Sequence, residues 1–221
     1  MVHGIGWLTE QGYGCIRSGL RNVYGPDEGV HTLLKRDIFS HPFKNFGRLD
    51  IISRMTAFAV SLALQDAGIE YSPIQKQDIG IIGTNGQGSL QADLAYFKDY
   101  VAGGRTLSRG NLFIYTLPSS PIGEAAIHFG FLGPLLYAAG ERNTVSTVLD
   151  AAGEMILAND APVMLAGKAE IDEALYFVLR NDDGQQSSSL CGLEEARSLV
   201  AATSDVTTLV QTFSDMAARK V

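Results

Sequence analysis

The sequence has 221 residues, of which 46% are hydrophobic and 19% are charged, as in an ordinary globular protein with one sizeable core. The formal net charge of −7 argues against a general nucleic-acid-binding protein, because such proteins need a basic surface. No apolar run approaches the roughly 20 residues of a membrane span, so we expect no membrane association.

The other global features favour the cytoplasm. Cys15 and Cys191 are the two cysteines, and they form neither a CxxC motif nor a metal-binding spacing. Such sparse use is typical of a reducing compartment. The first residues, MVHGIGWLTE, lack the charged and long apolar regions of a signal peptide. We therefore expect a cytoplasmic protein that holds no metal and no cofactor.

Apolar runs bounded by turn residues predict five β-strands. The run IGIIG at residues 79–83 is continuously apolar, which is typical of a strand that is covered on both faces of its sheet. The five predicted strands are residues 2–8, 79–83, 135–139, 163–166 and 174–180.

Apolar residues at helical spacing predict helices between and after these strands. Asp50 is the expected N-cap of one helix and Gly68 its end, and Leu94, Phe97 and Val101 are expected to face inward from another. The predicted helices are residues 28–36, 50–68, 90–101, 120–130, 144–158, 193–202 and 206–219. The rest of 13–45 is expected to be loop, and 181–189 a flexible linker.

Three segments resemble the N-terminal half of a β-ketoacyl-(acyl carrier protein) synthase, an enzyme with the thiolase-like fold. They are RLDIISRMTAFAVSLALQDAGI, FGFLGP and VMLAGKAE, and the interval from Gly133-Pro134 to Ala169-Glu170 matches a typical member without a gap. The resemblance implies an α/β fold with a mixed five-stranded sheet, helices on both faces and additional C-terminal helices. It covers residues 1–182, and we expect the linker and helices of 183–221 to belong to the same domain.

One position departs from the family pattern in a way that bears on catalysis. The family carries its nucleophilic cysteine at the elbow between a strand and a helix, and the resemblance places Arg142 there, within Gly140, Glu141, Arg142 and Asn143. A guanidinium stays protonated and is no nucleophile. The family's second half, which supplies further catalytic residues, is also not seen. The resemblance therefore implies the fold of a condensing enzyme without its chemistry.

The role of Arg142 has two interpretations. It could fill the former active site or bind a carboxylate or phosphopantetheine group. Alternatively it pairs with Glu141, Asp150 or a partner chain, which is the favoured interpretation because a buried arginine needs a charge partner. A locally basic run is likewise either a docking patch for an acidic carrier protein or a solvated face, the latter being commoner. It consists of Lys35, Arg36, Lys44, Arg48 and Arg54.

Other chemistry has weaker support. GTNGQGS, after the second strand, lacks the lysine of a P-loop and the glycine spacing of a dinucleotide site, so it is interpreted as a tight turn. The histidines are not paired for a metal, and His128 is expected to be structural.

The resemblance implies a non-catalytic partner or binding subunit in acyl-carrier-protein-linked fatty-acid or polyketide biosynthesis, comparable to a chain-length factor. The alternative is a β-ketoacyl synthase or acyltransferase that completes its active site with another chain. Because a half-fold would leave apolar surface exposed, we expect a homodimer or a heterodimer with a full ketosynthase, and acyl carrier protein is a further candidate partner.

Overall fold

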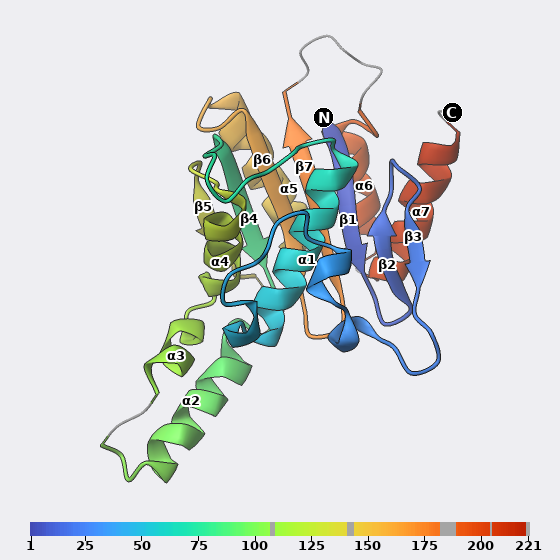
Figure 1. Cartoon of the computed structure of the whole chain (residues 1–221). Coiled ribbons are helices and arrows are strands. Elements are labelled where there is room, and N and C mark those ends of the chain that lie inside the picture. The colour runs from blue at the N-terminus through green and yellow to red at the C-terminus, as the bar shows by residue number, and fades with distance from the viewer. Residues whose placement is uncertain (107–108, 141–143, 182–188, 204, 220–221) are drawn as a thin grey trace.

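The computed structural model describes residues 1–106, 109–140, 144–181, 189–203 and 205–219. Within these residues seven strands form one mixed sheet in the order β3-β2-β1-β7-β6-β4-β5 (Figure 1). Strand β4 pairs in parallel with β5 and β6, and the other pairs are antiparallel. The strands are β1 (Val2–Leu8), β2 (Gly12–Cys15), β3 (Arg21–Val23), β4 (Ile79–Thr84), β5 (Leu135–Tyr137), β6 (Val163–Ala169) and β7 (Ala174–Arg180).

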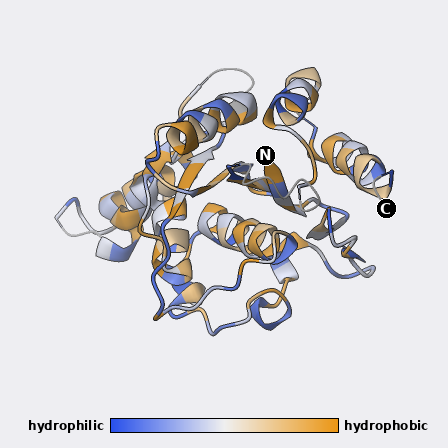
Figure 2. Cartoon of the chain, turned by 90° about the horizontal axis from the view of Figure 1, so that it is seen from above, coloured by the Kyte–Doolittle hydropathy of each residue, from blue (hydrophilic) through white to orange (hydrophobic). Residues whose placement is uncertain are grey.

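Helices cover both faces of this sheet (Figure 2). On one face α1 and α4 pack against each other and against the strands, and on the other α5, α6 and α7 enclose a second apolar cluster. The helices are α1 (Ile51–Asp66), α2 (Leu90–Ala102), α3 (Gly110–Phe113), α4 (Ser120–Phe129), α5 (Thr144–Leu157), α6 (Leu193–Ala202) and α7 (Val206–Ala218), with short 3₁₀ turns η1 (Val30–Thr32), η2 (Lys35–Asp37), η3 (Phe46–Arg48) and η4 (Ile114–Thr116). The α/β fold class is confirmed.

Close contact between α1 and β1 fixes the layer that supports the site. A Cβ atom on Gly6 would lie 2.2 Å from the backbone nitrogen of Ala63, so only glycine lets the helix approach the strand this closely. Asp66, the last residue of α1, is buried and accepts hydrogen bonds from the backbone N–H groups of Ile5 (2.8 Å), Arg17 (2.9 Å) and Ser18 (2.8 Å). The helix is therefore tied to β1 and to the turn after β2.

Most predicted elements are present at the expected residues. Asp50 caps α1 by accepting a hydrogen bond from the backbone of Ser53, as expected, and Gly130 ends α4 with a positive φ of 75°. Helix α7 buries the predicted apolar face, and the Phe213 ring meets Phe177 on β7 at 5.6 Å between centroids.

Three predictions about local structure were wrong. The sheet has seven strands rather than five, because residues 12–23 form the hairpin β2–β3 instead of a loop. The helix expected over 28–36 is replaced by two 3₁₀ turns. Helix α2 forms, but Leu94, Phe97 and Val101 are 44%, 61% and 43% exposed instead of facing inward. The reason is that α2 projects away from the sheet with α3 as an arm (Figure 1).

Two further predictions concern the linker and the membrane. Residues 182–188 of the predicted linker lie outside the described residues. Among the described parts of the chain, no helix is long and apolar enough to cross a membrane.

Candidate active site at the strand ends

The carboxyl ends of three parallel strands meet at one edge of the sheet. In the register, Gly83 of β4 stands opposite Tyr137 of β5 and Gly167 of β6. Ligands of open α/β sheets bind outside such carboxyl ends, because the loops that leave them gather there. The residues that follow 84, 137 and 169 are therefore expected to form a ligand site.

Hydrogen bonds join the three strand ends. Thr84 Oγ1 donates to the backbone oxygen of Ala138 at 2.7 Å, just after β5. Tyr137 Oη donates to Asn85 Oδ1 at 3.1 Å, and the same oxygen accepts from the backbone of Gly88. These bonds fix the turn GTNGQGS against β5, so the tight turn expected there is confirmed.

Glu170 completes this polar arrangement from the end of β6. Its Oε1 accepts a hydrogen bond from the backbone N–H of Gly86 at 2.7 Å. Partial burial raises the pKa of Glu170, while the Gly86 hydrogen bond and the nearby Lys168 oppose the shift. A carboxyl group with a raised pKa can hold a proton closer to neutral pH than an exposed one.

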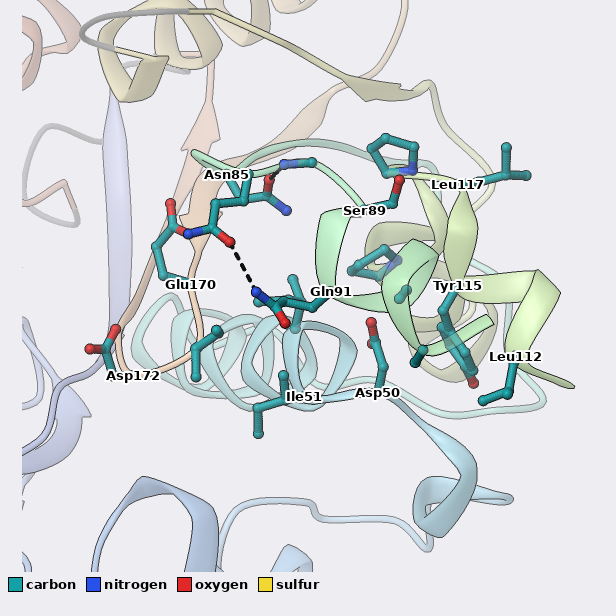
Figure 3. A pocket seen from close by; sticks show the side chains of 18 residues that line it. Asp50, Ile51, Asn85, Ser89, Gln91, Leu112, Tyr115, Leu117, Glu170 and Asp172 are labelled. Atoms are coloured by element: carbon teal, nitrogen blue, oxygen red, sulfur yellow. Dashed lines mark hydrogen bonds between the residues drawn. The ribbon is translucent and has the colours of Figure 1, made fainter. Parts of the chain in front are cut away.

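A cavity of about 480 Å³ opens beside these residues (Figure 3). Its volume lies within the range of about 300–1,000 Å³ that small-molecule sites occupy. The first turn of α1, the turn after β4, the start of α2, the segment 112–121 and the turn after β6 line it. Figure 3 shows the Asp50 carboxylate directed into the cavity and Asp172 at its outer edge.

The predicted elbow adjoins the site, but little of it is described. Gly140 follows β5 and is exposed, whereas Glu141, Arg142 and Asn143 lie outside the described residues. Helix α5 begins at Thr144. The assignment of the elbow, and of Arg142 to the nucleophile position, stays a prediction from the sequence.

Neither cysteine belongs to the cavity. Cys15 is buried against α1, where its Sγ donates to the backbone oxygen of Leu62 at 3.3 Å, and burial raises the pKa of its thiol to about 12. A thiol with so high a pKa is not a nucleophile at neutral pH. Cys191 is also buried, next to β1. Both therefore behave as small hydrophobic residues.

The predicted basic residues lie apart from the cavity lining. Lys35, Arg36, Lys44 and Arg48 are exposed on and around η2 and η3, and Arg54 is half-buried on α1. The Arg54 guanidinium lies 5.7 Å from the ring centre of Phe46. A carrier-docking role for these five residues stays a prediction. In the described residues, no group of three or more His, Cys, Asp or Glu side chains could hold a metal ion.

Sequence reasoning missed several lining residues. Asn85 and Glu170 directly follow the observed strands β4 and β6, which extend past the predicted strand ends, and a position near a strand end could have indicated them. Asp50 was expected only as a helix cap, and no role was expected for Tyr115. Burial raises the pKa of Tyr115 to about 12, and its hydroxyl faces Glu124 Oε1 at 3.5 Å.

Comparison with solved structures places this architecture among ketosynthases. The ishigamide ketosynthase/chain length factor is 14% identical with a TM-score of 0.58, over 83% of this chain and 63% of that one. A β-ketoacyl synthase from Burkholderia phymatum STM815 is 14% identical with a TM-score of 0.60, over 81% and 58%. A type II polyketide synthase acyl-carrier protein in complex with its ketosynthase gives 14% identity and a TM-score of 0.52, over 81% and 57%.

These similarities show a shared fold, and the chain spans only 57–63% of the length of those structures. No curated protein matches the sequence. The model of the β-ketoacyl synthase N-terminal domain family matches residues 26–175, which is more than half of the chain. The protein therefore belongs to the β-ketoacyl synthase N-terminal domain family.

Proposed function

We propose that this protein is a non-catalytic partner or binding subunit in acyl-carrier-protein-linked fatty-acid or polyketide biosynthesis. The observation that carries the proposal is a ligand-sized cavity at the carboxyl ends of the parallel strands of a ketosynthase fold whose predicted elbow has arginine in place of the nucleophile. Such a site can hold an acyl group but cannot form an acyl-enzyme through that elbow.

The side chains of the cavity support binding rather than covalent catalysis. No cysteine or histidine stands among its lining residues in the described parts of the chain. The hydroxyl of Ser89 donates to the Asp93 carboxylate at 2.9 Å, so this serine is paired with a carboxylate and not with the histidine of a serine–histidine pair. The walls are instead mostly apolar, as expected for a site that encloses an acyl chain.

We further propose that the subunit acts as a dimer, with itself or with a full ketosynthase. Strand β5 is an edge of the sheet, and Leu135 and Leu136 on it are exposed. Unpaired edge strands readily pair with a second chain. The arm formed by α2 and α3 exposes further apolar residues, namely Leu90, Leu94, Phe97, Val101 and Phe113, which a partner would cover.

The alternative, an enzyme that completes its active site with another chain, is favoured by one observation. Glu170 lies at the cavity with a raised pKa, as general acids and bases often do. A partner that supplies a thiolate next to this carboxyl would give the pair a catalytic site.

Incubation of the purified chain with an octanoyl-loaded carrier protein tests the proposal. We expect a complex without transfer of the octanoyl group, measured by calorimetry and by intact-protein mass spectrometry. Replacing Lys35 and Arg36 with Glu should weaken the complex, whereas Lys76→Glu, an exposed lysine outside the predicted patch, should not. Transfer of octanoyl to the isolated chain would refute the non-catalytic role, and no complex at any concentration would refute carrier binding.

A further inference from the structure

The cavity at the strand ends combines apolar walls with charge of a single sign. Ile51, Ile52, Ala92, Leu112 and Pro121 supply apolar surface from α1, α2, α3 and α4. The charged residues of the lining are all acidic, and no lysine, arginine or histidine is among them in the described residues; they are Asp50, Glu170 and Asp172.

Two of the carboxylates are held in place by the fold. Asp50 is fixed at the N-cap of α1, where its Oδ1 accepts from the backbone of Ser53 at 2.8 Å, and Glu170 is fixed by Gly86. In Figure 3 these two side chains stand on different sides of the cavity, with Asp50 directed into it. A ligand in the cavity therefore lies between negative groups that the protein cannot easily move away.

Among the described residues, two cations that act on the cavity's side chains lie outside its lining. Lys168 is half-buried and forms an ion pair with Glu173 on the other side of the turn. The charge of the exposed Arg48 lowers the pKa of Tyr115. Burial and acidic neighbours, Glu124 and Asp50 among them, raise that pKa by more. The partial burial that raises the pKa of Glu170 also leaves its carboxylate less hydrated than an exposed one.

We propose that this cavity selects its ligand by charge, accepting an apolar chain whose head group is neutral or cationic and rejecting the same chain with a carboxylate. The inference rests on the proposed function for the identity of the neutral ligand, an acyl thioester. A free fatty acid, or an acyl group that carries its own carboxylate, would lose water and meet fixed negative charge without a compensating cation among the lining residues that the structure describes. The neutral thioester loses no such charge hydration.

Three probes of equal chain length test the proposal on the full chain at pH 7.5: the octanoyl thioester of N-acetylcysteamine, octylamine and octanoate. Calorimetry should show binding of the first two and at least tenfold weaker binding of octanoate. Replacing Glu170 with Gln and Asp50 with Asn should reduce the ratio of the dissociation constant of octanoate to that of the thioester. Asn at position 50 preserves a side chain that can cap α1. Glu195→Gln, on exposed α6 surface, should leave the ratio unchanged.

A cavity-filling variant locates the binding. Ala92→Trp should abolish binding of the thioester and of octylamine, whereas Ala201→Trp, on the exposed end of α6, should not. Equal binding of octanoate and thioester would overturn charge selection while the proposed function stands. Binding of octylamine alone would support charge selection and overturn the acyl-binding function. If no probe binds, or if Ala92→Trp has no effect, the cavity is not the site and the inference fails.

Discussion

The buried imidazole of His128 should make the stability of this protein strongly dependent on pH. His128 lies on α4, its ring stacks on Phe43 at 3.8 Å between centroids, and its Nε2 has no hydrogen-bond partner within the described residues. Burial lowers the pKa of His128 to about 4, with a smaller contribution from nearby His41. The predicted structural role of this residue is consistent with that packing.

The sign and size of the effect follow from proton linkage. The unfolded chain binds a proton at His128 with a pKa of about 6.5, whereas the folded chain binds it only near pH 4. The stabilisation is therefore complete above pH 6.5 and is lost as the pH falls toward 4. With about 1.4 kcal/mol for each pKa unit, the loss between pH 7.5 and pH 4.5 amounts to about 2–3 kcal/mol.

Urea unfolding followed by circular dichroism measures this loss, and a variant isolates it. His128→Phe keeps a ring next to Phe43 but cannot be protonated, so it should lose about 2–3 kcal/mol less than the natural protein between the two pH values. Other titrating groups contribute equally to both proteins and cancel in the comparison. If the two proteins lose the same free energy of unfolding, His128 does not titrate as its burial indicates, and the reasoning is wrong.

Three further changes test the packing around the site, each by urea unfolding. Asp66→Ala removes the acceptor of one buried backbone N–H group, that of Ile5, and of two partly buried ones, and should lower the free energy of unfolding by at least about 2 kcal/mol; a loss below about 1 kcal/mol would contradict its role as a tie. Phe213→Ala should lower the free energy of unfolding by about 3–5 kcal/mol, because the ring is fully buried against β7. A much smaller loss would show that α7 does not pack there. Arg197→Ala should cost under about 1 kcal/mol, since its pairs with Asp150 and Glu194 are partly exposed.

The elements predicted correctly from the sequence are those whose apolar residues or helix-end residues directly indicate a buried strand or a helix end. Continuous apolar runs such as IGIIG have few alternatives to a covered strand, and Asp50 and Gly130 carry the chemistry of helix ends. Strands β2 and β3 escaped because they are only four and three residues long and because β2 contains two glycines, which weaken any strand signal. The spacing of apolar residues correctly predicted helix α2. Such spacing cannot show whether another part of the protein packs against the apolar face of the helix.

The site was less accessible to sequence reasoning than the fold. Asn85 and Glu170 could be placed at strand ends, but Asp50 and Tyr115 reach the cavity only because α1 and the segment before α4 pack beside those ends. That arrangement depends on tertiary contacts far apart in the sequence. The elbow could be aligned with the family but lies mostly outside the described residues, so its chemistry rests on residue identity alone.

The position of β1 has a consequence for how the chain is made. Strand β1 lies inside the sheet and pairs with β7, which comes much later in the chain, and Ile5 stands opposite Phe177. A ribosome must therefore add residues 9–173 after β1 before β7, its second neighbour in the sheet, is made. Until then β1 can pair only with β2 and its other edge stays unpaired, a state that favours aggregation. Completion of the sheet is thus coupled to the translation of β7.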